Sequence, residues 1–369
     1  MSGYILLEDG ARFEGELVGA APPACGEVVF TTGMAGYQEA VTDPSFHAQL
    51  IVFTYPHIGN YGASADGMES ARVHAAGVVM REAVNRDDAP GAEASWLDWL
   101  AAEGVPAITG VDTRALVRHI RDRGAMRGGI FAAAVPEAEA RERVDAEPSM
   151  EGRDLARVVT PEAMTRVGEG DLRIAALDTG IKTSIVRNFV SRGVTLDLHP
   201  CTTSADELLR SDPDGVFLVP GPGDPAALDY VVDTIRELLG RKPVFGICLG
   251  HQLLSRAVGL ETYKLPFGHR GSNHPVKDLR TGRIAITSQN HGFAVEGRLQ
   301  DAPIRRETEY GAVELTRFNL YDGTVEGIRL LDAPAGCVQY HPEAGPGPND
   351  SLELFDDFIA EIREASGNA

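Results

Sequence analysis

The strongest constraint on the fold of this chain is a regular alternation of apolar runs and helical patterns that begins near residue 172. The strand-like runs end in polar or glycine-rich turns, and stretches with helical periodicity separate them. The strand patterns cover 173–180, 194–199, 215–223 and 243–248, and the helical patterns cover 182–192, 205–211 and 226–240. Strands that alternate with helices form a parallel sheet with helices on both faces. We therefore predict an α/β, doubly wound and mostly parallel sheet.

The N-terminal part of the chain has a different pattern. Up to about residue 135, strand-like runs at 27–32 and 50–55 and a helical pattern at 95–104 are separated by glycine-rich turns. Residues 136–170 are charged and poor in large apolar side chains. A chain of 369 residues is also long for one core. We predict a separate N-terminal α/β domain over 1–140, a linker over 141–171 and the sheet domain over 172–369.

The net charge of −20 argues against two classes of partner, because nucleic acid and anionic membranes are bound by basic surfaces. No apolar run approaches the roughly 18 residues of a membrane span, and no secretory signal is visible. The cysteines are far apart and form no C-x-x-C pair, which argues against disulfides and a zinc site. We expect a cytoplasmic protein with reduced thiols at Cys25, Cys201, Cys248 and Cys337.

Lysine is scarce relative to acidic residues. The chain has 54 Asp and Glu residues, but its lysines are Lys182, Lys242, Lys264 and Lys277 alone. A surface rich in carboxylates and poor in lysine stays solvated where salt screens the repulsion between charges. This composition favours a salt-rich cytoplasm, and an ordinary acidic protein is the alternative.

Cys248 lies between two glycines, after an apolar run and before a helical pattern. Small residues two positions before and after a nucleophile permit the sharp strand-to-helix turn that presents its side chain. In open α/β sheets the reactive groups collect beyond the carboxyl ends of the strands. The N-terminus of the following helix favours a thiolate. The motif alone is equally compatible with a buried structural cysteine.

A thiol nucleophile needs a base and a group that orients the base. His341 follows an apolar strand-like stretch, and Glu343 lies two residues on, where it points the same way and can hydrogen-bond the imidazole. Taken alone, His341 is more simply interpreted as a surface histidine beside a turn. Together with Cys248, the two residues predict a Cys–His–Glu triad.

The motifs 246-GICLGHQ-252 and 341-HPE-343 resemble those of the class I, or triad-type, glutamine amidotransferases. In that family Cys, His and Glu hydrolyse the side-chain amide of glutamine. The stretch 26–62, which begins GEVVFTTGMAGYQEA, is similar to the small, glutamine-hydrolysing subunit of carbamoyl-phosphate synthetase, as are 219-VPGPGDP-225, 267-FGHRGSNHPVKD-278 and 287-TSQNHGFAV-295. The N-terminal motif favours this small subunit over the other class I amidotransferases, because the others lack the N-terminal domain.

The resemblance implies a role for each matching residue. Cys248 would attack the glutamine carboxamide to form a γ-glutamyl thioester, His341 would transfer protons, and Glu343 would orient His341. The backbone N–H groups of Leu249 and of the turn at Gly221 and Gly223 would meet the oxyanion, since glycine lets the backbone approach the substrate. Glutamine would be bound by Gln252, Asn290, Gly292, Phe293 and, from the N-terminal domain, Ser45.

The sequence contains no phosphate-binding G-x-x-x-x-G-K-[ST] loop, so we expect no ATP site in this chain. The spacing of His269, His274 and His291 does not recur as a metal-binding pattern, so we expect no metal site either. The resemblance implies a heterodimer with a large synthetase subunit that holds ATP and metal and receives ammonia through a protected passage. The carbamoyl phosphate would serve arginine and pyrimidine biosynthesis.

Two other functions are compatible with parts of this pattern. One is a Cys–His hydrolase of similar architecture, such as a γ-glutamyl peptidase-like enzyme that acts alone; the N-terminal motif argues against it. The other is a regulatory subunit without catalysis, against which the presence of Cys248, His341 and Glu343 argues. The segment Arg270–Ser272 departs from the residues expected in the family pattern, so its local contacts stay open.

Overall fold

The structure is a computed structural model that describes residues 1–299 and 304–365. The chain divides into two compact units. The N-terminal unit comprises Met1–Arg153 with Pro266–Gly271, and the C-terminal unit comprises Asp154–Leu265 with Ser272–Ala369. None of the described helices combines the length and the apolar character that crossing a bilayer requires.

The division between the units falls between Arg153 and Asp154, inside the predicted linker 141–171. This stretch carries secondary structure. It contains the end of helix α4 (Glu137–Ala146), the short helix α5 (Ala156–Val159) and the strand β10 (Thr165–Val167). Because β10 pairs with a strand of the C-terminal sheet, the second half of the stretch is part of that sheet.

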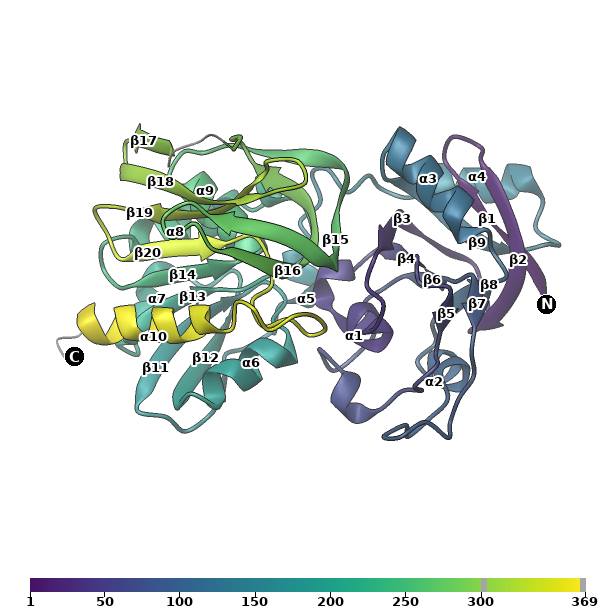
Figure 1. Ribbon diagram of the computed structural model, residues 1–369, viewed down its shortest axis with the longest axis horizontal. Helices are drawn as coiled ribbons and strands as arrows, with labels where there is room; N and C mark the ends of the chain where they lie inside the picture. The colour runs from purple at the N-terminus through teal and green to yellow at the C-terminus, as the bar shows by residue number, and fades with distance from the viewer. Residues whose placement is uncertain (300–303, 366–369) are drawn as a thin grey trace. The chain divides into compact units, whose positions relative to one another are not determined.

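The N-terminal unit is built around a closed barrel of seven strands (Figure 1). Apolar runs supply its interior, where Ile5, Leu50 and Ile130 are fully buried, and closure removes the exposed strand edges. The predicted strands 27–32 and 50–55 are confirmed as β3 and β4. The order around the barrel is β1 (Ser2–Leu7), β2 (Arg12–Gly19), β8 (Pro106–Thr109), β6 (Gly77–Val79), β4 (Gln49–Phe53), β3 (Ala24–Thr31) and β9 (Met126–Ala132).

Helices and a small ribbon complete this unit. The predicted helix at 95–104 is confirmed as α2 (Trp96–Ala102). Asp112 caps α3 (Thr113–Arg123) by accepting a hydrogen bond from the Ala115 N–H at 3.0 Å, and Gly124 ends this helix at a φ of 99°. The remaining elements are α1 (Tyr37–Thr42), the 3₁₀ turns η1 (Pro44–Phe46) and η2 (Ala65–Gly67), and the paired strands β5 (His57–Ile58) and β7 (Glu82–Ala83).

The C-terminal unit contains a sheet of eleven described strands (Figure 1). The five neighbouring strands β12, β11, β13, β14 and β20 pair in parallel, which confirms the predicted parallel sheet. Antiparallel strands flank them on both sides. The full order is β10, β12 (Val194–Pro200), β11 (Leu172–Asp178), β13 (Gly215–Leu218), β14 (Val244–Ile247), β20 (Ala335–Val338), β19 (Val325–Leu330), β16 (Ile284–Val295), β15 (Thr262–Asp278), β18 (Gly311–Asn319) and β17 (Ile304–Thr308).

Helices cover both faces of the parallel strands, because successive strand residues point to opposite faces. On β11, Ile174 packs in the cluster that contains Phe189 of α6 and Phe358 of α10, whereas Ala175 packs in the cluster of α7, α8 and α9. The predicted helices 182–192, 205–211 and 226–240 correspond to α6, α7 and α8. The helices and 3₁₀ turn of this unit after α5 are α6 (Thr183–Val190), α7 (Ala205–Leu209), η3 (Pro225–Ala227), α8 (Asp229–Leu238), α9 (Leu249–Ala257) and α10 (Glu353–Ala365).

The edge strand β10 is held to the sheet by a buried carboxylate. Asp197 of β12 is fully buried and receives Arg166 of β10 at 2.6 Å and Arg173 of β11 at 2.7 Å. We expect Asp197→Asn to lower the free energy of unfolding by about 2 kcal/mol, because it removes the shared anion of two half-exposed guanidinium groups. Urea denaturation of the full chain measures this loss.

Asp229→Asn is the matched control for that measurement. Asp229 is an exposed carboxylate that pairs with Arg256 at 2.8 Å. Exposed ion pairs contribute less than about 1 kcal/mol, so this variant should unfold at nearly the wild-type urea concentration. Equal losses in the two variants would contradict a stabilising role for the buried carboxylate.

Candidate active site

The sharp turn predicted around Cys248 is present between β14 and α9. Cys248 joins the strand to the helix with a φ of 54° and a ψ of −105°, a backbone conformation that residues other than glycine rarely adopt. Its backbone N–H donates to the Val338 carbonyl at 2.9 Å, which attaches the turn to β20. Cys248 is buried, at the N-terminal end of α9 and at the carboxyl ends of the parallel strands.

The two glycines around Cys248 allow α9 to approach the sheet closely. A Cβ atom on Gly246 would lie 2.8 Å from the backbone of Gly250, and one on Gly250 would lie 2.2 Å from the Leu218 carbonyl oxygen. Real Cβ atoms do not make contacts this short, so both positions require glycine. Packing of the helix against β13 and β14 therefore fixes the position of the sulfur.

Gly221 needs to be glycine for a reason that the sequence did not indicate. A Cβ atom on Gly221 would lie 2.1 Å from the Thr179 carbonyl oxygen, so the missing side chain permits two loops of the protein to pass each other. The predicted reason, close approach of substrate, is not needed to explain this glycine. Gly223 has a φ of 97°, which also favours glycine. The oxyanion role of this turn and of Leu249 stays a prediction.

His341 and Glu343 are hydrogen-bonded to each other, as predicted. His341 Nδ1 lies 2.7 Å from Glu343 Oε1, and both side chains are buried. The backbone N–H of His341 donates to the Ser288 carbonyl at 2.9 Å, which fixes the segment that carries the base. Nε2 of His341 is buried and makes no hydrogen bond within the described part of the chain, so it is the nitrogen that can exchange a proton with Cys248.

Lys182 is a member of this site that the sequence analysis missed. Its buried ammonium group donates to Glu343 Oε1 at 3.0 Å and to the Gly345 carbonyl at 3.1 Å. Lys182 follows β11 at the carboxyl ends of the parallel strands and precedes α6. Its position just after a predicted strand, in a chain with four lysines, is the signal that could have identified it.

These contacts set the charge of each group. Burial alone would raise the pKa of Glu343, but the charges of Lys182 and His341 lower it well below its usual range. Burial alone would lower the pKa of His341, but the charges of Glu343 and Cys248 raise it to about 10. At neutral pH, Glu343 is therefore a carboxylate and His341 an imidazolium that holds the proton needed by a leaving group.

The predicted glutamine-binding residues of β16 lie next to the nucleophile. Cys248 Sγ is 3.5 Å from the Asn290 carbonyl oxygen. Gln252 of α9 donates from Nε2 to the Phe293 carbonyl at 2.8 Å and to Gln339 Oε1 at 3.0 Å. Because these bonds use both N–H groups of the amide, the Gln252 oxygen is the atom that can meet a substrate. The structure thus brings together Cys248, Gln252 and the part of β16 that contains Gly292.

Ser45 belongs to the N-terminal unit, in the 3₁₀ turn η1. Its backbone N–H donates to the side chain of Asp43 at 2.8 Å, and its hydroxyl oxygen is buried without a hydrogen-bond partner in the described part of the chain. A buried hydroxyl without a partner is compatible with a ligand contact. Its predicted reach toward glutamine stays a prediction.

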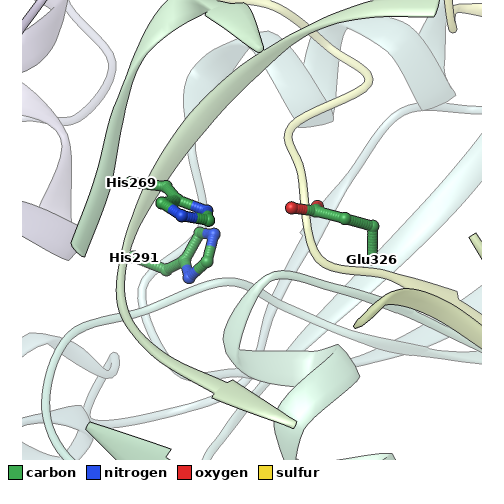
Figure 2. A group of neighbouring side chains, drawn as sticks. All are labelled: His269, His291 and Glu326. Carbon is green, nitrogen blue, oxygen red and sulfur yellow. The ribbon is translucent and has the colours of Figure 1, made fainter. Parts of the chain in front are cut away.

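Figure 2 labels three buried side chains of types that bind metals: His269, His291 and Glu326. His269 lies in the stretch Pro266–Gly271, which clusters with the N-terminal unit. In the C-terminal unit, both ring nitrogens of His291 are occupied by hydrogen bonds, Nδ1 to the Phe293 carbonyl at 2.7 Å and Nε2 to Gln289 Oε1 at 2.9 Å. These bonds favour a structural role for His291, and the expectation that this chain holds no metal stays a prediction.

Known proteins resemble both parts of the chain. Residues 5–130 match the family model of the carbamoyl-phosphate synthase small chain, CPSase domain, and residues 175–361 match that of class-I glutamine amidotransferase. The carbamoyl phosphate synthase small chain of Chlorobaculum tepidum is 48% identical over 369 residues, covering 99% of this chain and 98% of the relative. Its counterparts in Bacillus caldolyticus and Xanthomonas campestris are 46% and 44% identical, covering 99% and 98% of this chain and 97% and 98% of their own.

The buried Lys182 leads to a prediction about the reactivity of Cys248. In Lys182→Met the pKa of Glu343 should rise, because the cation that lowers it is lost. His341 then loses part of its counter-charge, and alkylation of Cys248 by iodoacetamide should slow about tenfold at neutral pH. Mass spectrometry of the Cys248 peptide measures this rate. Lys242→Met, which removes a lysine paired with the exposed Asp212 at 2.8 Å, is the control and should leave the rate unchanged.

The raised pKa of His341 predicts how stability depends on pH. A histidine whose folded pKa lies near 10 stabilises the fold fully below the unfolded value of about 6.5, and this contribution is lost as the pH rises through 10. The free energy of unfolding of wild type should therefore fall between pH 7 and 10. It should fall more steeply than that of His341→Gln, by up to about 1.4 kcal/mol per pH unit. Urea denaturation across this range tests it. A constant difference between the two proteins would show that His341 is neutral when folded.

Proposed function

The chain belongs to the carbamoyl phosphate synthase small-chain family, in which it is the glutamine-hydrolysing subunit, and we propose that Cys248, His341 and Glu343 carry out the hydrolysis. The observation that carries this proposal is the buried hydrogen bond of 2.7 Å between His341 and Glu343, beside a cysteine held in a strained strand-to-helix turn. Nucleophile, base and orienting group are the parts that acyl transfer through a thiol requires.

In the first half of the reaction, the Cys248 sulfur attacks the carboxamide carbon of glutamine. The developing oxyanion is met by the Leu249 N–H at the first turn of α9 and by one N–H of the turn at Gly221 and Gly223. His341 donates its proton to the nitrogen as the C–N bond breaks, so ammonia leaves and a γ-glutamyl thioester remains. Glu343, kept ionised by Lys182, holds the imidazole in position.

In the second half, a water molecule replaces ammonia. His341, now neutral, takes a proton from water while the water oxygen attacks the thioester carbon. The C–S bond breaks, glutamate is released, and the proton on His341 restores the imidazolium beside the sulfur. Through both halves, the Gln252 oxygen, Asn290, Gly292 and Phe293 hold the carbon skeleton of glutamine.

The ammonia has to reach a second active site before it is protonated. Ammonia becomes ammonium in water near neutral pH and then cannot act as a nucleophile. We propose that a large synthetase subunit pairs with this chain as a heterodimer, holds ATP and metal, and receives ammonia through a protected passage. The absence of a phosphate-binding loop from the sequence supports this division of labour. The carbamoyl phosphate would enter arginine and pyrimidine biosynthesis.

The composition of the chain bears on where this occurs. A net charge of −20 and four lysines favour a cytoplasm rich in salt, where screening reduces the repulsion between surface carboxylates. Activity in the assay below should therefore increase with salt concentration.

The decisive assay measures carbamoyl phosphate formed from bicarbonate and ATP by the chain and its large partner, with either glutamine or ammonia as the nitrogen source. Wild type should work with both sources. Cys248→Ser should lose glutamine-dependent synthesis at least about a thousandfold, because a hydroxyl at this position is a far weaker nucleophile, and should keep ammonia-dependent synthesis.

Cys201→Ser is the control for loss of a buried thiol that is not part of the triad, and it should keep glutamine-dependent synthesis. If ammonia but not glutamine supports synthesis by wild type, this chain binds the synthetase without catalysis. If wild type hydrolyses glutamine alone at full rate and supports no synthesis, it is an independent hydrolase. Either result would overturn the proposal.

A further inference from the structure

A chain of buried hydrogen bonds connects Glu326 of β19 to residues 290–293 of β16, the segment proposed to bind glutamine. Glu326 Oε2 accepts from Gln289 Nε2 at 2.9 Å, and Gln289 Oε1 lies 2.9 Å from His291 Nε2. His291 Nδ1 lies 2.7 Å from the Phe293 carbonyl oxygen, which also accepts from Gln252 Nε2 at 2.8 Å. All five side chains are buried. The proposed triad does not use Glu326, Gln289 or His291.

The orientation of the Gln289 amide follows from a backbone group. The Thr287 hydroxyl donates its proton to the His274 carbonyl at 2.8 Å, so its oxygen can only accept from Gln289 Nε2, which lies 3.1 Å away. The amide nitrogen of Gln289 therefore faces Thr287 and Glu326. Its oxygen, Oε1, must face His291.

This orientation fixes the protonation of His291. The Phe293 carbonyl and the Gln289 amide oxygen are both acceptors without protons. Each ring nitrogen of His291 lies within 3 Å of one of them, at 2.7 and 2.9 Å. A neutral imidazole would place the lone pair of one ring nitrogen against one of these oxygens, which is unfavourable in a buried site. This arrangement favours a proton on both nitrogens, which is the imidazolium form of His291.

A buried cation needs a counter-charge, and a carboxylate oxygen of Glu326, which hydrogen-bonds the Gln289 amide, lies within 4.8 Å of a ring nitrogen of His291. Glu326 is fully buried and its Oε1 accepts from Asn319 Nδ2 at 3.0 Å. The Asn319 amide is itself oriented by the Tyr321 backbone N–H, which donates to Asn319 Oδ1 at 2.9 Å. Two amide donors, Gln289 and Asn319, therefore fix the position of the Glu326 carboxylate.

We propose that Glu326 is a positioning residue for glutamine: through Gln289 it holds His291 as an imidazolium, which in turn fixes the Phe293 carbonyl and the segment from Asn290 to Phe293. The same carbonyl anchors Gln252, so one acceptor aligns two sides of the site. The inference rests on the proposed function, in which this segment binds glutamine. Glu326 touches no reacting atom in this scheme and acts only through its neighbours.

The first test is spectroscopic and uses the full chain with nitrogen-15-labelled histidine at neutral pH. Both ring nitrogens of His291 should carry protons in wild type, with the signals assigned by their loss in His291→Gln. In Glu326→Gln one nitrogen should lose its proton, because the counter-charge is gone. A wild-type His291 with one bare nitrogen would overturn the proposal.

The second test separates positioning from general stability by steady-state kinetics in the assay above. Glu326→Gln should raise KM for glutamine about fivefold and change kcat less than about twofold, as expected for loss of one net hydrogen-bond contribution in substrate binding. Glu314→Gln, which changes a buried carboxylate of β18 paired with Arg329 at 2.7 Å, should leave KM unchanged.

A double variant tests rescue. Gln289→Glu combined with Glu326→Gln moves the carboxylate next to His291 Nε2, and it should restore both the imidazolium signals and a KM within about twofold of wild type. Unchanged KM and unchanged signals in Glu326→Gln would overturn the proposal. If wild type hydrolyses no glutamine, the proposed function fails. The protonation of His291 in wild type and in Glu326→Gln then still decides whether Glu326 acts on His291 through Gln289.

Discussion

The close approach of α9 to β13 and β14 is the constraint on which the candidate site depends. Cys248 occupies a backbone conformation that costs on the order of 1–3 kcal/mol, and such a conformation persists only where surrounding packing determines it. Gly246 and Gly250 permit that packing, since a side chain at either position would collide with backbone. Apolar contacts of Leu253 and Leu254 on the same helix bury it in the core. The stability of the parallel sheet thus offsets the strain at the sulfur.

The charged groups of the site follow two parallel strands that are far apart in the sequence. Lys182 follows β11, early in the C-terminal unit, and Glu343 follows β20, near its end. In a parallel sheet both strands deliver their carboxyl ends to the same edge, which is why residues 161 positions apart form a buried ion pair of 3.0 Å. His341 contacts the same oxygen, Oε1 of Glu343, so one carboxylate serves a lysine and a histidine. This arrangement both stabilises the charge on the imidazole and fixes its orientation.

The sequence predicts the parts whose signals are local. The alternation of strands and helices predicts the parallel sheet, and glycine spacing with the His341–Glu343 pair predicts the core of the site. Closure of the N-terminal barrel could not be predicted, because it depends on pairing β1 with β9, for example Gly3 with Ala132, which leaves no periodic pattern. The contact of Lys182 and the bonds of Gln252 depend on which loops the completed fold brings together, so residue type alone did not reveal them.

Three buried histidines of the C-terminal unit show how neighbours determine what an imidazole can do. His251 lies among apolar groups beside the Cys337 thiol, at 3.1 Å, and burial lowers its pKa to about 3, so it stays neutral. His291 has an acceptor at each nitrogen, so it can hold a charge but has no nitrogen free for substrate chemistry. His341 has a carboxylate at Nδ1 and no hydrogen bond at Nε2 within the described residues, so it alone of the three combines a stabilised charge with a nitrogen able to transfer a proton. The same side chain therefore serves packing, positioning and proton transfer, and the acceptors around each ring decide which.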